Sequence, residues 1–280
     1  MMLQVQNLVK SFKSKLAVND ISFQVNEGEI YGLLGSNGAG KTTTIKIIMT
    51  LLRPDSGQVL IRSQDVFTNP VETKKLIGYS PETPLFYEKL TGEEFLHFIG
   101  KIRGVKGSLD KISNYADMFE MSDSIRNEIG SYSRGMRQKL ALMGALIDDP
   151  EYLILDEPTA GLDPRFNNLI KRLILEEKKR GRSILLSTHL TVNAEEICDR
   201  IGVIHNGILL AEGTVEELMS STGSSTLEEV FIKLVGGGKL EQNGTLSVKE
   251  PKTRYGAVKD DKDGNDEKDD NADKKGKNKN

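Results

Sequence analysis

The sequence contains no tryptophan and only one cysteine, Cys198, among its 280 residues. One cysteine cannot form a disulfide within the chain, so the disulfide-rich secreted class is excluded. Long hydrophobic runs are also missing: stretches such as 152–155 and 184–186 are far shorter than the roughly 20 residues of a membrane-spanning helix. The first residues lack the apolar core of a secretory signal, so we expect a cytoplasmic chain.

An excess of charge of either sign is absent as well. The 38 Lys and Arg residues nearly balance the 41 Asp and Glu residues, which leaves a formal net charge of −3. No overall basic field attracts the chain to nucleic acid, and we expect no nucleic-acid partner. Residues 259–280 are nearly all Lys, Asp, Glu, Asn and Gly. We therefore predict a disordered charged tail over 236–280, because such a composition has little to bury.

The order of the hydrophobic patterns predicts an α/β fold. Residues 3–25 alternate polar and apolar side chains, which predicts short strands of an N-terminal antiparallel β subdomain. Strand and helix patterns then alternate, which is typical of a mostly parallel sheet covered by helices. The expected elements are strands over 30–34, 152–155, 183–187 and 201–204, a helix containing Ile45, Ile48, Met49 and Leu52, a helix over 167–180, and a hairpin at Asn206-Gly207.

A helical segment interrupts this alternation between about residues 84 and 147. Thr91 and Glu94 have the spacing of a capping box at the start of a helix. The apolar residues of this first helix are Phe95, Phe98, Ile99 and Ile102, and those of the last helix are Met136, Leu140, Met143 and Ile147. We therefore expect an inserted α-helical subdomain.

The stretch Gly35-Ser-Asn-Gly-Ala-Gly-Lys-Thr42 satisfies the phosphate-loop pattern G-x-x-x-x-G-K-[ST], between a predicted strand and a predicted helix. Glycines let the backbone N–H groups face phosphate oxygens, and the start of the helix adds partial positive charge. Lys41 is expected to reach the β- and γ-phosphates, and the Thr42 hydroxyl is the expected Mg²⁺ ligand. The sequence thus predicts a nucleoside triphosphate site.

An apolar strand over 152–155 ends in two carboxylates, Asp156 and Glu157. The carboxyl ends of parallel strands form the edge at which α/β folds bind ligands. Because successive strand residues point to opposite faces, we assign Asp156 to the Mg²⁺ shell and Glu157 to polarising the attacking water. A strand ending of this kind is usually only a solvated end, and the upstream phosphate loop favours the functional reading.

The motif Tyr132-Ser-Arg-Gly-Met136 separates phosphate-loop families from one another. Ser133 is a good N-cap for the helix that follows, and Gly135 allows the backbone to approach a phosphate closely. The motif lies 23 residues before Asp156 (156 − 133 = 23). With this spacing, about residues 1–235 resemble the ATP-binding subunits of ABC transporters, and we expect them to form one such domain.

The motif departs from the family's Leu-Ser-Gly-Gly-Gln at Arg134 and Met136, and it keeps the serine and the second glycine. The resemblance still implies contacts from Ser133 and the backbone to a γ-phosphate. Ala160-Gly-Leu-Asp163 matches the family's D-loop, and His189 matches its switch histidine at a strand end. A lone histidine is otherwise most often structural.

Two further positions match the family. Phe12 corresponds to the aromatic residue that stacks on adenine, although a strand phenylalanine is often a core residue. Glu82 replaces a usual glutamine that senses Mg²⁺ and faces the membrane partner, and a carboxylate can also ligate Mg²⁺. The resemblance implies nucleotide contacts from Phe12, Gly35, Ser36, Asn37, Gly38, Ala39, Gly40, Lys41, Thr42, Thr43, Ser133, Gly135, Met136 and Asp163, Mg²⁺ ligation by Thr42, Glu82 and Asp156, and catalytic roles for Glu157, His189 and Lys41.

The resemblance implies an ATPase that uses ATP and Mg²⁺. Two ATP-binding subunits would meet head to tail, each site combining the phosphate loop of one chain with the Ser133 motif of the other. Closing and opening of this dimer would drive a separate membrane-spanning permease from the cytoplasmic face of the cell membrane. The sequences of residues 78–82 and 226–231 are most similar to those of ABC-2 type exporter subunits, so the resemblance favours export.

Two alternatives remain open. A soluble relative acting on ribosomes or DNA usually carries two tandem ATPase halves or a long coiled-coil insertion, and neither is present in the sequence. An unrelated phosphate-loop kinase or GTPase would leave the Ser133 motif and His189 unexplained. Recovery of ribosomes or DNA, or a preference for guanine nucleotides, would reveal these alternatives.

Overall fold

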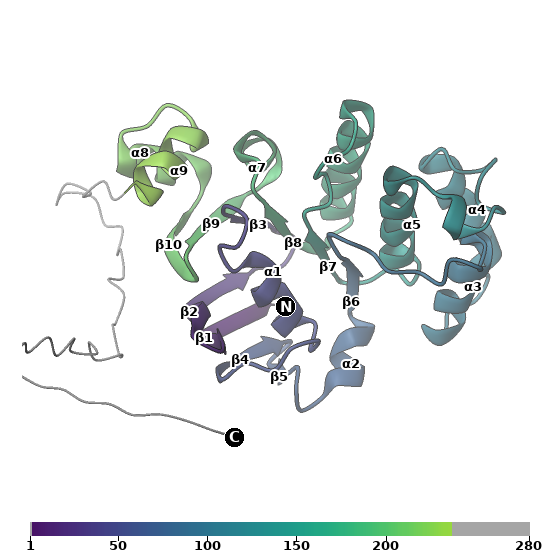
Figure 1. Cartoon of the computed structure of the whole chain (residues 1–280), viewed down its shortest axis with the longest axis horizontal. Helices are drawn as coiled ribbons and strands as arrows, with labels where there is room; N and C mark the ends of the chain where they lie inside the picture. Colours follow the sequence, from purple (N-terminus) through teal and green to yellow (C-terminus); the bar gives the residue numbers. More distant parts are fainter. Residues whose placement is uncertain (1, 237–280) are drawn as a thin grey trace, which may run out of the picture. The chain divides into compact units, whose positions relative to one another are not determined.

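Two β-sheets form the centre of the fold in this computed structural model, which describes residues 2–236 (Figure 1). The first sheet is antiparallel and has the strand order β2-β1-β4-β5. Its strands are β1 (Leu3–Phe12), β2 (Lys15–Val25), β4 (Ser56–Ile61) and β5 (Gln64–Asp65). β1 and β2 have 10 and 11 residues, so the expectation of short strands was wrong for this pair.

The second sheet has the order β10-β9-β3-β8-β7-β6 and is parallel except for the pair β9 and β10. Its strands are β3 (Ile30–Leu34), β6 (Ile77–Ser80), β7 (Tyr152–Asp156), β8 (Ser183–Thr188), β9 (Arg200–His205) and β10 (Ile208–Gly213). Asn206 and Gly207 join β9 to β10 with φ values of +48° and +79°, which are the left-handed conformations that such a tight hairpin requires. The predicted hairpin is confirmed.

Helices cover the sheets and fill the connection between β6 and β7. They are α1 (Lys41–Ile48), α2 (Pro70–Lys75), α3 (Gly92–Ile102), α4 (Ser108–Met118), the 3₁₀ helix η1 (Ile129–Ser131), α5 (Arg134–Leu146), α6 (Pro164–Lys179), α7 (Thr191–Ile197), α8 (Val215–Thr222) and α9 (Leu227–Val235). Figure 1 shows α3, α4 and α5 together on one side, beyond β6. The predicted α/β class, with its antiparallel sheet and inserted helices, is confirmed.

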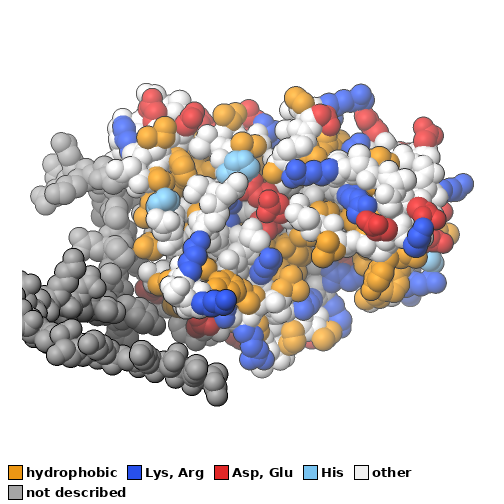
Figure 2. Space-filling view, viewed as in Figure 1, with side chains coloured by type: hydrophobic (Ala, Val, Ile, Leu, Met, Phe, Trp, Pro, Cys, Tyr) orange, Lys and Arg blue, Asp and Glu red, His pale blue; other side chains and the backbone are white. Residues whose placement is uncertain are grey.

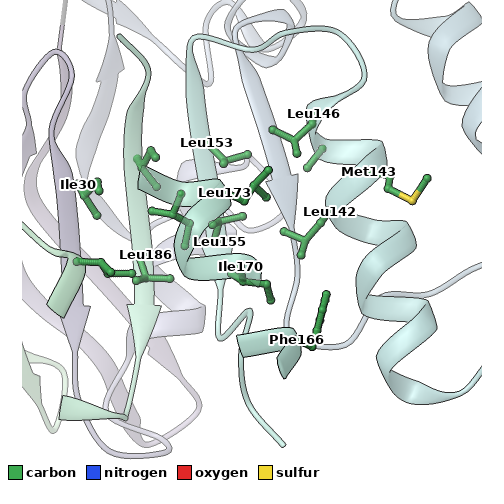
Figure 3. Close-up of a cluster of buried hydrophobic side chains, with 14 of the residues drawn as sticks. Ile30, Leu142, Met143, Leu146, Leu153, Leu155, Phe166, Ile170, Leu173 and Leu186 are labelled. Carbon is green, nitrogen blue, oxygen red and sulfur yellow. The ribbon is translucent and has the colours of Figure 1, made fainter. Parts of the chain in front are cut away.

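Buried side chains on both faces of the parallel sheet hold the layers together. In β7, Leu153 and Leu155 belong to a cluster with α5 and α6, whereas Tyr152 and Ile154 belong to a cluster shared with the antiparallel sheet and α1. Figure 3 shows the first cluster, in which Leu142 and neighbouring residues of α5 and α6 lie beside the strands. Burial on both faces explains why β7 is apolar throughout.

Two predicted helices have different bounds in the structure. α1 ends at Ile48, so Met49 is its C-cap and Leu52 lies beyond it. α6 begins at Pro164 rather than at residue 167. The Asp163 side chain accepts the Phe166 N–H, and proline is well suited to the first helical position, so both residues favour this earlier start.

The apolar stripe predicted for α3 is only partly buried. The capping box is present, but Phe98 and Ile102 are 48% and 66% exposed, and the buried apolar side chain of the helix is Leu96. This helix therefore presents apolar surface outside the core. Among the described residues, no helix combines the length and apolarity needed to cross a membrane. Beyond Gly236, the predicted tail lies outside the described residues.

Candidate functional site

The loop between β3 and α1 packs against β2 and the β9–β10 hairpin. Its last residue, Gly40, has φ +116° and is the N-cap of α1. A Cβ on Gly40 would lie 2.6 Å from the carbonyl oxygen of Ala17 and 3.2 Å from Cδ1 of Ile204. The Ala39 carbonyl accepts the Gly207 N–H at 2.8 Å. The loop is thus held in a fixed shape by β2 and by the β9–β10 turn.

Lys41 is the first residue of α1, and its side chain turns back over this loop. Its ammonium donates hydrogen bonds to the carbonyl oxygens of Gly35 at 2.7 Å and Ser36 at 3.2 Å. Lys41 Nζ also lies 3.1 Å from Oε1 of Glu157, and both side chains are almost fully buried. The cation expected to contact phosphate is therefore paired with the predicted catalytic carboxylate.

Glu157 lies between two predicted catalytic groups. Its backbone has φ +49°, a left-handed conformation that non-glycine residues adopt rarely and that is often found at functional sites. Its N–H donates to Oγ of Ser187 at 3.1 Å. Its Oε2 is 2.8 Å from Nδ1 of His189. The structure thus joins Lys41, Glu157 and His189 in one polar chain, and these bonds hold the carboxylate in one orientation.

Asp156 lies beside the start of α1. Its Oδ1 accepts hydrogen bonds from the Ser187 hydroxyl at 2.5 Å and the Thr42 hydroxyl at 3.3 Å. Burial raises the pKa of Asp156, the two hydroxyl bonds lower it, and the negative charges of Glu82 and Glu157 raise it further, which leaves the pKa raised. Ionised Asp156 is therefore unfavourable without a cation.

These residues fit a hard divalent cation. Oδ2 of Asp156 is buried and lacks a hydrogen-bond partner among the described residues. Thr42, Asp156 and Glu82 all offer oxygen atoms, the ligand type that Mg²⁺ prefers. The described part of the chain contains no group of three or more His, Cys, Asp or Glu side chains able to hold a metal alone. Mg²⁺ commonly uses one or two carboxylates and completes its shell with phosphate and water.

A pocket of about 470 Å³ opens over the loop. It is lined by Phe12, Lys15, Ala17, Asn37, Gly38, Gly40, Lys41, Thr42, Thr43, Glu82 and Glu157. Phe12 is 46% exposed, so it is not a core residue, and Lys10 Nζ lies over its ring, 5.8 Å from the ring centre. Lys15 and Ala17 were not among the predicted residues. Phe12 pairs with Lys15 across the β1–β2 hairpin, so the register brings them together.

Gln138 on α5 was also missed. It is 5% exposed, and its Nε2 donates to Oγ of Ser80 at 3.2 Å and to the Pro81 carbonyl at 3.4 Å. These bonds connect the inserted helices with the residues just before Glu82. Nothing in the local sequence indicates this contact, because it joins segments that are 57 residues apart.

The structure separates four predicted site residues from the pocket. Ser133 is the N-cap of α5, and its Oγ accepts the Met136 N–H at 3.3 Å. Asp163 is the N-cap of α6. Ser133, Gly135, Met136 and Asp163 are all absent from the pocket's lining. Gly35, Ser36, Ala39, Asp156 and His189 do not line it either, but they belong to the phosphate loop or bond to its neighbours Thr42 and Glu157. The predicted residues thus form two groups, one around the phosphate loop and one at the starts of α5 and α6.

A mostly parallel sheet that carries a phosphate loop and two carboxylates at its carboxyl edge defines a phosphate-loop nucleotide hydrolase. Within that class the chain belongs to the ABC transporter family, whose profile, described as "ABC transporter", matches residues 18–160. The chain is therefore an ATPase and an ATP-binding subunit of the kind that powers transport.

Curated relatives cover most of the chain. It is 37% identical to the ABC transporter ATP-binding protein NatA of Bacillus subtilis over 79% of this chain and 92% of the relative. It is 36% identical to the daunorubicin/doxorubicin resistance ATP-binding protein DrrA of Streptomyces peucetius over 80% and 69%. It is 38% identical to the bacitracin transport ATP-binding protein BcrA of Bacillus licheniformis over 75% and 69%. These matches confirm the resemblance to ATP-binding subunits that include drug-resistance members.

Solved structures agree with this assignment. The structure of an ATP-binding subunit of an ABC transporter superposes with a TM-score of 0.79 at 32% identity, covering 84% of this chain and 99% of the other. An ATP-binding cassette in its ADP conformation superposes with a TM-score of 0.69 at 26% identity, covering 82% and 98%. The fold and the family assignment therefore agree.

Proposed function

We propose that the chain binds MgATP in the pocket over the phosphate loop and uses its hydrolysis to power a separate membrane-spanning subunit of an exporter. The observation that supports this best is the polar chain that runs from Lys41 through Glu157, both of them buried, to His189, whose side chain is 36% exposed. Lys41, which would bind phosphate, lies beside Glu157, which would accept a proton. Phe12 at the open side of the pocket would stack on adenine.

The triphosphate would lie on the loop residues from Gly35 to Thr43. Its γ-phosphate would replace the Glu157 carboxylate as the partner of Lys41 and leave that carboxylate free to hold a water. Glu157 would accept a proton as the water oxygen bonds to the γ-phosphorus and the bond to the ADP oxygen breaks. The Nδ1 contact of His189 would keep Glu157 in line with the phosphate.

Thr42 and Asp156, with Glu82 beside them, would hold Mg²⁺. The ion would neutralise charge on the phosphate oxygens. Glu82 would place a second carboxylate where the family usually has an amide. Gln138 would hold the residues before Glu82 in position through Ser80 and Pro81.

A second copy of the chain would complete each site. Ser133 and Asp163 lie away from the pocket of their own chain, at the starts of two helices. Ser133 caps the start of α5, and the N-termini of helices favour bound phosphate. Head-to-tail association would place Ser133 of one copy over the γ-phosphate held by the other. ATP would thus close the dimer, and hydrolysis would open it.

The membrane-spanning partner would dock in an apolar groove of about 390 Å³ beside Glu82. Pro81 and Leu85 line it together with Phe95 and Ile99 of α3, and Leu85 is 91% exposed. Figure 2 shows hydrophobic side chains gathered in the region of α3. An apolar segment on the cytoplasmic side of a membrane protein fits this surface, because the groove is lined mostly by apolar side chains. Glu82, which is next to Pro81 in the sequence and also lines the nucleotide pocket, would transmit the state of that pocket to the partner. The chain would then lie at the cytoplasmic face of the membrane.

Substitution of Glu157 by Gln tests the proposal. Glu157→Gln should lower ATP turnover by about 10³-fold or more, because it removes the proton acceptor. The variant should still bind MgATP and form a dimer. Glu176→Gln, an exposed substitution on α6, is the matched control and should keep full turnover.

Affinity purification of the Glu157→Gln chain from detergent-solubilised membranes with MgATP then identifies the partner. A stoichiometric multi-spanning protein is the expected result. Recovery of ribosomes or DNA without a membrane protein would instead favour the soluble alternative. Unchanged turnover in Glu157→Gln would overturn the catalytic assignment itself.

A further inference from the structure

The side chain of Arg134 connects the start of α5 with the turn 160–163 that precedes α6. Arg134 is the first residue of α5, directly after Ser133. Its Nη2 donates a hydrogen bond to the Ala160 carbonyl at 3.2 Å. The family's motif has a glycine at this position, so the bond depends on a residue in which this chain departs from the motif.

Gly161 provides a flat surface for the same guanidinium. Its φ is +69°, and a Cβ built on it would lie 3.1 Å from Nη1 and 3.4 Å from Cζ of Arg134. The guanidinium therefore covers the face of Gly161 on which other residues carry a side chain. A planar guanidinium can cover a backbone face and donate a hydrogen bond at once, which an ammonium cannot do.

Further contacts join the same two segments. A Cβ on Gly135 would lie 3.8 Å from Cδ2 of Leu162, so the next residue of α5 also meets this turn. A separate ion pair, Arg165 with Glu120 at 2.6 Å, joins the first turn of α6 to a residue just after α4, and so to the inserted helices but not to α5. Behind them, Phe166 and its neighbours on α6 pack with α5 in the buried cluster shown in Figure 3. The 160–163 turn and the start of α5 thus share one surface.

We propose that Arg134 is a positioning residue that fixes the 160–163 turn against the start of α5. Ser133 and Asp163 then meet the nucleotide of the second chain as one rigid unit. This inference rests on the proposed head-to-tail dimer. It assigns to Arg134 a role within its own chain, rather than a contact across the dimer.

The dimer constant of full-length Glu157→Gln protein in saturating MgATP, measured by sedimentation, tests this role. Adding Arg134→Ala should weaken the dimer by about tenfold, because association must then order the 160–163 turn that Arg134 otherwise holds in place. The affinity of the dilute monomer for MgATP should not change, because Arg134 is not part of the pocket. Arg134→Lys should recover part of the loss, since an ammonium still reaches a carbonyl.

A double-mutant cycle distinguishes the proposed positioning role of Arg134 from a direct contact between Arg134 and the partner chain. Gly161→Ala inserts a Cβ beneath the guanidinium, whereas Gly28→Ala carries a similar backbone strain at φ +66° with no atom within 4 Å. Gly161→Ala should weaken the dimer more than Gly28→Ala does. In the Arg134→Ala background this excess should disappear.

Each result has one interpretation. If Glu157→Gln protein does not dimerise with MgATP, the proposed dimer is wrong. Hydrogen exchange then tests the contact between Arg134 and the 160–163 turn by itself. Unchanged exchange over 160–163 in Arg134→Ala would overturn the positioning role. If the parent dimerises and Arg134→Ala dimerises equally well, the inference is wrong. The remaining result is a dimer weakened by Arg134→Ala in which Gly161→Ala still has a larger effect than Gly28→Ala in the Arg134→Ala background. That result would overturn the positioning role and indicate a direct contact of Arg134 across the dimer.

Discussion

Asp156 is a carboxylate that the proposed cation site requires. Its burial disfavours the charged form in the nucleotide-free protein. It is 1% exposed, and burial raises its pKa. A carboxyl whose pKa is higher in the folded chain stabilises the fold below its unfolded pKa. That contribution is lost as the pH rises through the folded pKa. At neutral pH, ionised Asp156 therefore lowers the free energy of unfolding of the nucleotide-free protein.

We expect Asp156→Asn to raise the Tm of the nucleotide-free protein at neutral pH by roughly 2 to 4 °C. The substitution removes a buried charge and keeps an oxygen that accepts the Ser187 and Thr42 bonds. The gain should shrink as the pH falls through the raised pKa of Asp156, because the carboxyl of the parent protein is then neutral as well. Thermal unfolding of both proteins across this pH range measures the difference.

Asp149→Asn is a control of opposite sign. Burial raises the pKa of Asp149, but hydrogen bonds and charges from Lys111 and Arg182 outweigh burial and leave the pKa lowered. The ionised form therefore stabilises the fold above the unfolded pKa, and this stability is lost as the pH falls through the folded pKa. Asp149→Asn should thus be less stable than the parent at neutral pH. An Asp156→Asn protein that is also less stable would contradict our account of its burial.

At the level of single residues, the sequence predicts those groups whose roles follow from a local motif. Lys41 and Thr42 follow from the phosphate-loop spacing, and Glu157 follows from the end of an apolar strand. The pairing of Lys41 with Glu157 does not, because it depends on the positions of β3 and β7 in the sheet. Gln138 likewise reaches Ser80 only through packing of α5 on β6.

The phosphate loop is an element whose shape is set by its neighbours as well as by its own glycines. Gly40→Ala should weaken MgATP binding by more than tenfold, because its Cβ would meet the backbone of Ala17 at 2.6 Å. That contact involves backbone, so the loop itself must move. Fluorescence titration with a labelled ATP analogue and the Tm together measure the effect.

Gly38→Ala is the matched control in the same loop. Gly38 also has a left-handed φ, +80°, but a Cβ there has no atom within 4 Å. The substitution carries only backbone strain of about 1 to 2 kcal/mol. It should lower the Tm modestly and, because Gly38 itself lines the pocket, it should weaken MgATP binding less than Gly40→Ala does. Equal loss of binding in both variants would show that strain, and not the contact with β2, is responsible.

At the level of elements, strong local signals predict helix ends well and exposed faces poorly. The capping box at Thr91 and Glu94 is present as expected. The start of α6 at Pro164 was missed, although Asp163 and the proline carry the signal. The exposure of Phe98 was missed for another reason: helical spacing shows which residues share a stripe, but it cannot show whether another element covers that stripe.

At the level of the whole molecule, one chain carries both halves of the proposed site but does not bring them together. The phosphate loop lies beside β3, and Ser133 lies at the start of α5 in the inserted helices. Motif spacing along the sequence cannot give this separation, which depends on where the insertion packs. The resemblance to the family predicted it, and the structure is consistent with a site completed by a second chain.

The apolar groove gives the last prediction. Leu85→Asp places a charge on a surface that a partner segment would cover, and burial of an unpaired charge is strongly unfavourable. We therefore expect Leu85→Asp to abolish co-purification of the membrane-spanning subunit. MgATP binding should not change, because Leu85 does not line the nucleotide pocket. Ile232→Asp is the control, since Ile232 is also exposed, at 61%, but lies on α9 and outside the groove. A partner recovered with Leu85→Asp at the parental yield would exclude the groove as the docking site, and loss from both variants would show a general effect of added charge.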